Sequence, residues 1–228
     1  MALASRWLKA DVSLAELDWE TITGAKSGRQ LGVHHILNTE FRRKHSIELS
    51  DEDLHTLQLL HDETKAFLDA QLLPIVEPYH AQTPLYLPQI DIVHFRPLDK
   101  EQMLHHDIHR GDTALQRWSV LFYLHDTIST AVPMQPLSTL KALWNPRLSE
   151  KEKKKLCNPN LWAGLPVSAG TILLMQQSTA HYGVPDITKE RIVLFTIISP
   201  NADQNQTVWQ RRYAKMHKPS KEIQSDSD

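Results

Sequence analysis

The stretch RWSVLFYLH, Arg117 to His125, carries the strongest strand signal in the chain. It is rich in aromatic and β-branched side chains, which suit the half-buried surface of a sheet. Three other stretches share this character: QIDIVHFR (Gln89–Arg96), TILLMQ (Thr171–Gln176) and RIVLFTIIS (Arg191–Ser199). Four strands in the second part of the chain predict a domain built on a sheet.

A helix is predicted ahead of these strands. Ser50 and Asp53 match a capping pair, and apolar residues then recur at helical spacing up to residue 73. Pro74 and Pro78 are expected to end this helix, because proline cannot continue a helix interior. Residues before the helix show weak periodicity, which predicts loops, short strands and one short helix. The order favours a mainly β or α+β fold with the helix packed outside the sheet.

The chain of 228 residues fits a single domain. We expect residues 1–88 to form a helical support region and residues 89–200 to form the β core. An insert at residues 126–169 shows no strand signal, and a short charged helix is predicted within it at Leu148 to Leu156. Connections of this length are typically lids, binding loops or disordered segments. Residues 216–228 are expected to be a disordered tail.

Composition excludes several classes of protein. The net charge of −2 gives no sign of a nucleic-acid surface, and the single cysteine, Cys157, cannot form an internal disulfide. No apolar run is long enough for a membrane span, and the first residues lack the apolar core of a signal peptide. We therefore expect a cytoplasmic protein without membrane or nucleic-acid partners. Part of the predicted helix is a candidate homodimer contact.

The segment LHHDIHRGD, Leu104 to Asp112, concentrates histidines around an aspartate. In a strand, residues i and i+2 project from the same face, so His105 and Asp107 can bind one metal ion together. An H-x-D motif alone is close to a chance event in a chain with 13 histidines. A helical alternative places His105 and His109 at i and i+4, as in a zinc pair.

Residues about 75 positions later make a chance match of the H-x-D motif much less probable. His181 follows the predicted strand that starts after Gly170, and Arg191 opens the next strand. A second histidine and an arginine thus follow the H-x-D motif, each at the edge of a predicted strand. The joint context is far less probable by chance than either motif alone.

This arrangement resembles the Fe(II)/2-oxoglutarate-dependent dioxygenases, particularly the prolyl-4-hydroxylase-like branch. The resemblance covers roughly Gln89 to Ser199 and rests on motif order and spacing. It implies a double-stranded β-helix, also called a jelly-roll or cupin-like core, with supporting N-terminal helices. It also implies Fe(II), 2-oxoglutarate and O2 as cofactor and cosubstrates, with ascorbate as a candidate stimulant. The implied metal ligands, which are also the catalytic residues, are His105, Asp107 and His181.

The resemblance also assigns the cosubstrate pocket. Arg191 is expected to bind the distal carboxylate of 2-oxoglutarate, because a guanidinium makes a planar bidentate pair that lysine cannot reproduce. Tyr123 is expected to line the same pocket, and His109 is a candidate substrate contact. Asp107 favours hydroxylation, since the halogenating members of the family lack this carboxylate. Phe95 stands where the family often has a tyrosine, so that hydroxyl is missing here.

The substrate stays open at this point. We expect hydroxylation of an unactivated C–H bond in a small molecule, such as an amino acid or a natural-product intermediate, with release of succinate and CO2. A protein hydroxylase of prolyl type is the alternative within the same superfamily. From other classes, the alternatives are a non-catalytic jelly-roll binding protein and a cupin-type metalloenzyme without 2-oxoglutarate.

Overall fold

The computed structural model describes residues 2–15, 17–25, 28–79, 84–87, 89–97, 107, 117–128, 132–133, 149, 162–177, 179, 181, 183 and 190–200. Its centre is a five-stranded antiparallel sheet in the order β1-β2-β9-β3-β8. The strands of this sheet are β1 (Arg29–Gly32), β2 (Asp91–Phe95), β3 (Trp118–Tyr123), β8 (Ile172–Gln176) and β9 (Arg191–Ile198). The four strands predicted from sequence are all confirmed. Their observed ends lie within two residues of the expected ones.

The N-terminal region is more helical than the sequence predicts. It contains α1 (Ala2–Ala15), α2 (Trp19–Thr23), α3 (Val33–Leu37) and α4 (Thr39–Lys44), with β1 between α2 and α3. For residues 1–49 the expected short strand is present as β1, but the expectation of loops with only one short helix is wrong. Three of these helices have no more than six residues, too short to show a helical period. They depend on tertiary packing and on caps such as Asp18, which accepts a hydrogen bond from the backbone N–H of Thr21.

The long helix α5 (Asp51–Val76) begins where the sequence predicts, at a capping box formed by Ser50 and Asp53. It does not end before Pro74, as predicted, but continues to Val76 and into the 3-10 turn η1 (Glu77–Tyr79). Pro74 lies in the last turn, so only one helical hydrogen bond is lost there. Burial of the final apolar residues of the stripe, including Val76, compensates for that loss.

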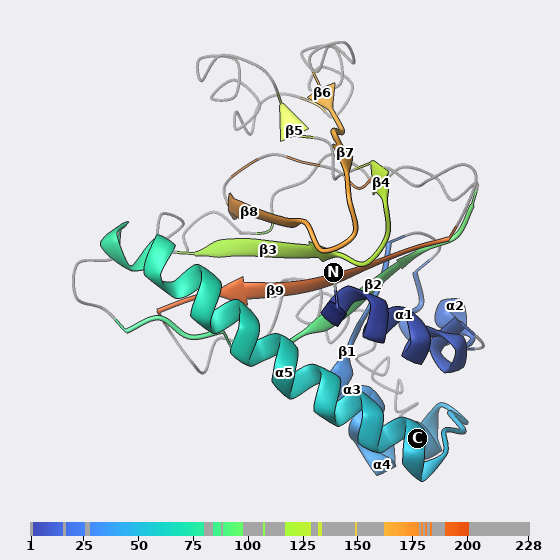
Figure 1. Cartoon of the computed structure of the whole chain (residues 1–228). Coiled ribbons are helices and arrows are strands. Elements are labelled where there is room, and N and C mark those ends of the chain that lie inside the picture. The colour runs from blue at the N-terminus through green and yellow to red at the C-terminus, as the bar shows by residue number, and fades with distance from the viewer. Residues whose placement is uncertain are drawn as a thin grey trace, which may run out of the picture.

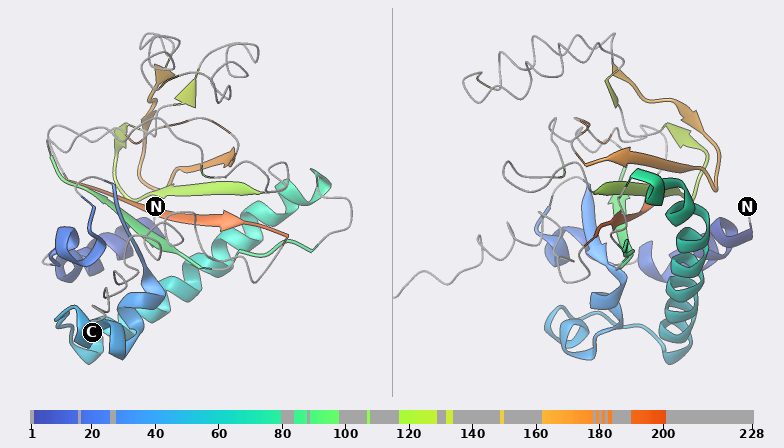
Figure 2. Two further views of the ribbon diagram at one scale, coloured as in Figure 1. Left: turned by 180° about the vertical axis from the view of Figure 1, so that it is seen from behind. Right: turned by 90° about the vertical axis from the view of Figure 1, so that its left-hand side faces the viewer.

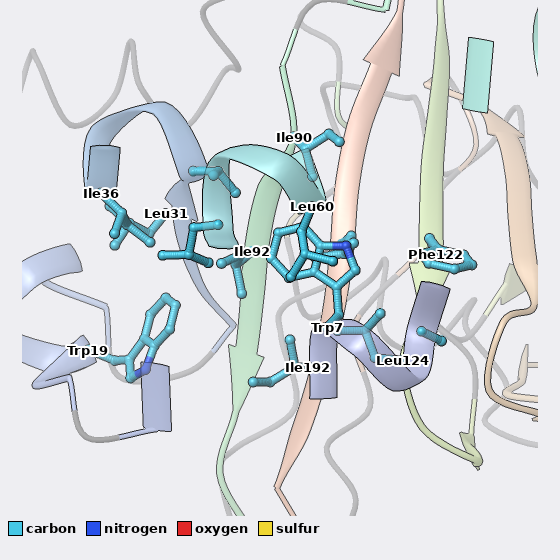
Figure 3. Close-up of a cluster of buried hydrophobic side chains, with 14 of the residues drawn as sticks. Trp7, Trp19, Leu31, Ile36, Leu60, Ile90, Ile92, Phe122, Leu124 and Ile192 are labelled. Carbon is cyan, nitrogen blue, oxygen red and sulfur yellow. The ribbon is translucent and has the colours of Figure 1, made fainter. Parts of the chain in front are cut away.

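The helices cover one side of the sheet, as predicted from the element order. Figures 1 and 2 show α5 running along the sheet with α1 beside it, and α3 and α4 near the start of α5. We call this side the helix face. Its core joins Trp7 of α1 and Leu60 of α5 to strand residues such as Ile92 and Ile192, and Figure 3 shows how these side chains interlock. Non-directional burial of this apolar surface holds the two layers together.

The opposite side is called the insert face, because Val167, at the end of the insert, packs on it. Alternation along the strands assigns residues to the two faces. Val93, Leu121, Tyr123 and Phe195 belong to the insert face, since they form one buried cluster. The central strand β9 is buried on both faces, which explains its nearly continuous apolar sequence.

The insert contains short strands that the sequence does not signal. They are β4 (Thr127–Ile128), β5 (Val132–Pro133), β6 (Trp162–Ala163) and β7 (Pro166–Val167), joined as the pairs β4-β7 and β5-β6. At the base of the insert, the backbone N–H of Ala169 donates to Asp126 Oδ1 over 2.8 Å. The insert therefore leaves and rejoins the sheet at one place. Two-residue strands lie below what alternation can reveal in a sequence.

Several predictions fall outside the described residues. These are the charged helix predicted within the insert, Cys157 and the C-terminal tail. The described part of the chain is an α+β arrangement built on an antiparallel sheet. The complete double-stranded β-helix stays a prediction. Among the helices of the described part of the chain, none is long and apolar enough to cross a membrane.

Candidate active site

The strand register brings residues from distant parts of the sequence into rows across the insert face. One row runs from Gly32 through Asp91, Phe195 and Leu121 to Leu173. Phe95 and Arg191 are paired in another row, toward the start of β9. The residues predicted to bind metal and cosubstrate therefore share one face of the sheet wherever the structure describes them.

Asp107 and His181 come together, as the H-x-D…H hypothesis requires. Asp107 Oδ1 lies 3.5 Å from His181 Nε2, and both side chains are largely buried. The other carboxylate oxygen, Oδ2, accepts a hydrogen bond of 2.5 Å from Ser119 Oγ. Ser119 belongs to β3 and has the same parity as Tyr123, so the bond anchors Asp107 over the insert face.

His181 is oriented by a second contact. Its Nδ1 lies 2.9 Å from the carbonyl oxygen of Thr179. A carbonyl accepts only, so Nδ1 carries the proton in neutral imidazole and Nε2 presents its lone pair toward Asp107. This is the tautomer that a metal-ligating histidine needs, and such backbone contacts are typical of the surroundings of metal ligands.

The donor set fits a divalent metal ion. An ion about 2.1 Å from each atom has room between a nitrogen and an oxygen that are 3.5 Å apart. Imidazole and carboxylate together suit iron of the 2-His-1-carboxylate type. The described residues alone form no group of three potential ligands. His105, the predicted third ligand, lies outside them. His109 also lies outside the described residues.

Arg191 is buried at the start of β9, with 1% of its surface exposed. Its Nη1 donates to the carbonyl oxygen of Ile128 over 2.8 Å, and its Cζ lies 4.3 Å from the centre of the Phe95 ring. The cation is therefore held between an aromatic face and a backbone acceptor of the insert. A fixed guanidinium in a desolvated place is suited to binding a carboxylate.

Tyr123 has no exposed surface and lies in the apolar cluster of the insert face. Its backbone is fixed by hydrogen bonds to Gly170 and Thr171 at the start of β8. This cluster also contains Phe95, whose ring supports Arg191, so Tyr123 lies on the same face of the sheet as Arg191. A role of its hydroxyl toward a cosubstrate stays a prediction.

A further carboxyl group on the insert face was not predicted. Asp91 is 5% exposed, and burial raises its pKa to about 6, against the effect of a hydrogen bond from Gln30. It sits beside Gly32, where a Cβ would meet the His34 ring at 2.4 Å and Asp91 Oδ1 at 3.0 Å. Burial also lowers the pKa of His34 to about 4, with a smaller effect of neighbouring histidines. Burial thus shifts both groups toward their neutral forms: His34 is neutral at pH 7, whereas Asp91, with a pKa of about 6, is still mostly ionised there.

Sequence reasoning missed Ser119 and the two carbonyl groups that hold His181 and Arg191. Ser119 has a usable signal, because it is the polar residue on the same strand face as Leu121 and Tyr123. Phe95 was noted only as a missing hydroxyl, and the structure shows that its ring supports Arg191 instead. The carbonyl groups leave no signal, because any residue can supply one.

The chain was compared with known proteins. No family model and no curated protein matches it. It is similar to HygX from Streptomyces hygroscopicus with nickel, 2-oxoglutarate and hygromycin B bound, at 18% identity over 62% of this chain and 65% of HygX, with a TM-score of 0.45. It is also similar to EctD from S. alaskensis with bound Fe, at 16% identity over 64% of this chain and 54% of EctD, with a TM-score of 0.46.

A third similar structure is an oxidoreductase of the 2OG-Fe(II) oxygenase family from Burkholderia pseudomallei. It is 14% identical over 64% of this chain and 61% of that chain, with a TM-score of 0.40. In each of the three, the chain spans less than two thirds of the neighbour's length. At these identities and TM-scores the likenesses say nothing about activity, and the chemistry follows from the residues of the site.

Proposed function

We propose that this protein is a non-haem Fe(II)- and 2-oxoglutarate-dependent dioxygenase. The observation that carries the proposal is the meeting of Asp107 Oδ1 and His181 Nε2 at 3.5 Å. The two residues are 74 positions apart in the sequence, and each is oriented by a separate contact, with Ser119 and with the Thr179 carbonyl. Arg191, buried on the same face of the sheet, adds the cation that the cosubstrate requires.

His105, Asp107 and His181 would hold the iron. Two neutral imidazoles and one carboxylate give the divalent ion a net positive site, which suits an anionic chelating cosubstrate. When bound, iron with 2-oxoglutarate and O2 supplies the oxidation of an unactivated C–H bond, and succinate and CO2 are released. Ser119 and the Thr179 carbonyl keep their ligands in place, so that the site is preformed.

Arg191 would bind the distal carboxylate of 2-oxoglutarate. Phe95 covers one side of the guanidinium and the Ile128 carbonyl takes one of its N–H groups. These contacts fix the plane of the fork before the ligand arrives, which lowers the entropy lost on binding. Tyr123 would line the same pocket through its buried side chain. Hydrophobic neighbours exclude water and strengthen the charge pairing.

For the substrate we propose a small molecule such as an amino acid or a natural-product intermediate. The insert rejoins the sheet beside Ile128, whose carbonyl contacts Arg191, and this connects the insert to the cosubstrate pocket. A protein side chain is the alternative substrate. Succinate release measured across both kinds of candidate distinguishes the two.

The direct test is anaerobic titration of the protein with Fe(II) and 2-oxoglutarate. A weak metal-to-ligand charge-transfer band in the visible range is expected from the chelate. Its absence in folded protein contradicts the proposal. A band without any turnover of 2-oxoglutarate to succinate, under air and with candidate substrates, would instead support a non-catalytic binding protein.

Two variants assign the roles of the residues. His181→Ala should weaken Fe(II) binding beyond the ten- to hundredfold that loss of a supporting contact costs, whereas His55→Ala, at an exposed position of α5, should not. Arg191→Ala should weaken 2-oxoglutarate and leave Fe(II) binding in place, with exposed Arg43→Ala as its control. Equal loss of both ligands in the Arg191 variant would contradict its role.

A further inference from the structure

A polar contact joins the ends of β2 and β9 on the helix face of the sheet. His94 Nε2 is hydrogen-bonded to Glu190 Oε1, which belongs to the residue just before β9. The His94 side chain is 2% exposed and that of Glu190 is 39% exposed. The contact therefore runs from the buried layer to the rim of the protein.

The N-terminal helical layer holds His94 in this place. Trp19 of α2 stacks on the His94 ring, with ring centres 4.9 Å apart and planes inclined by 22°. Glu20, also in α2, forms an ion pair of 3.2 Å with Arg96, two residues after His94. The imidazole thus has a fixed orientation, with Nε2 directed at Glu190.

The same two strand ends carry the cosubstrate residues on the opposite face. Neighbouring residues of a strand point to opposite sides, so Phe95 and Arg191 lie on the insert face while His94 and Glu190 contact each other on the helix face. Phe95 is paired with Arg191 in the register. Glu190 places a carboxylate one residue before Arg191, whose guanidinium is proposed to bind 2-oxoglutarate.

We infer that His94 is a positioning residue that holds the Glu190 carboxylate on the helix face and away from Arg191. This inference rests on the proposed function and deepens it. Glu190 lies just before β9, so strand alternation does not fix its side chain to one face. If the side chain turned toward Arg191, its charge would compete with the distal carboxylate of 2-oxoglutarate for the guanidinium. The hydrogen bond to His94, braced by Trp19, makes this competing arrangement unfavourable.

Changes at Glu190 test the idea without disturbing the core, because the side chain is partly exposed. Glu190→Asp keeps the charge but shortens the side chain by one methylene, so that the carboxylate no longer reaches His94. We expect roughly tenfold weaker binding of 2-oxoglutarate to the Fe(II)-loaded protein, the size of effect that a nearby competing charge produces at a partly exposed site. Glu190→Gln has no charge to compete and should bind 2-oxoglutarate as the wild type does.

A rescue experiment separates this role from a merely structural one. His94→Phe preserves the ring that stacks on Trp19 but releases Glu190, so 2-oxoglutarate binding should weaken by a similar factor. Adding Glu190→Gln to His94→Phe should restore it, since the freed group is then neutral. His94→Gln, which keeps a donor, should also bind normally, and Glu63→Gln on α5 is the matched surface control.

The probe for specificity is 2-oxobutyrate, which has the same metal-chelating end as 2-oxoglutarate but lacks the distal carboxylate. Its binding to the Fe(II)-loaded variants should be unchanged. The inference is overturned if Glu190→Asp binds 2-oxoglutarate like the wild type, if the double variant stays defective, or if both oxo acids weaken equally. A wild-type protein that gives no charge-transfer band refutes the proposed function instead, and this inference with it.

Discussion

The helix face and the insert face use the same five strands but carry different polar groups. On the helix face, polar side chains bond to neighbours in the adjoining layer or to backbone: Trp7 Nε1 donates to Thr64 Oγ1 over 2.7 Å, and Thr196 Oγ1 donates to the Gln89 carbonyl over 2.5 Å. On the insert face, a buried arginine and two aspartates lie among apolar residues. The helix face also holds a buried arginine, Arg29, which is paired with His94 in the register. Burying charge is costly unless it is paired or used.

The difference indicates that the two faces have different roles. Apolar packing on the helix face supplies stability, and charged groups on the insert face supply binding. Changes in the apolar core of the helix face should therefore alter the free energy of unfolding and leave ligand affinity per folded molecule unchanged. The contact between His94 and Glu190 is the exception on this face. Changes on the second face should do the reverse, with one exception at Asp91.

The largest effect is expected from the core of the helix face. Leu60→Ala removes a side chain that is 1% exposed and should lower the free energy of unfolding by about 2–5 kcal/mol through lost burial and a residual cavity. Urea unfolding measures this. The adjacent Leu59→Ala is the control, because that side chain is 44% exposed. Equal losses in the two variants would contradict the assigned packing of α5.

Asp91→Asn should stabilise the protein at neutral pH. Burial raises the pKa of Asp91 from 3.8 to about 6, so the folded protein holds a proton that the unfolded chain has already released. Stability from this group is thus present at low pH and is lost as pH rises from about 4 to 6. The loss is roughly 3 kcal/mol, since each pKa unit corresponds to about 1.4 kcal/mol.

The measurement is the difference in unfolding free energy between Asp91→Asn and the wild type across this pH range. The difference should grow from pH 4 to pH 6 and then level off. Taking the difference removes the opposite trend of His34, whose lowered pKa makes stability fall as pH drops below 6.5. Asp69→Asn on α5, in a partly exposed ion pair with Lys65, should change stability by less than about 0.5 kcal/mol. A flat difference for Asp91 would show that its carboxyl is solvated.

Ser119→Ala should affect ligand binding more than stability. Loss of the hydroxyl frees Asp107 to rotate, and supporting contacts of this kind are worth about ten- to a hundredfold in metal affinity. Fe(II) affinity measured anaerobically by competition with a chelator tests this, with exposed Ser168→Ala as the control. Unchanged affinity would mean that Ser119 does not orient a metal ligand.

The smallest effect is expected at the hydrogen bond between α1 and α5. Thr64→Val removes the acceptor of the buried Trp7 N–H and should cost about 1 kcal/mol of unfolding free energy. In a Trp7→Phe background the same substitution should cost nothing further, because the donor is absent. A cost that persists in that background would assign the effect to the shape of the side chain.

The sequence predicted the parts of the fold that carry long periodic patterns. The stripe of α5 and the apolar runs of four strands have enough residues to show their period, whereas α2, α3 and the two-residue strands of the insert do not. The helix was expected to end before Pro74 but continues to Val76, because packing of the last turn outweighs local propensity. For the site, motif order predicted Asp107, His181 and Arg191 on one face. Of the contacts that orient them, the backbone carbonyl groups leave no signal in the sequence, whereas Ser119 does, as the polar residue on its strand face.

The hydrogen bond between Ala169 and Asp126 has a consequence for how the protein can change. Because β4 pairs with β7 directly beside this bond, the residues at which the insert leaves and rejoins the sheet are spatial neighbours. A chain segment of almost any length can bridge adjacent points, because the entropy of loop closure grows only slowly with length. The insert can therefore be replaced by a segment of another length or sequence, which would change the residues that cover the insert face without altering the five strands.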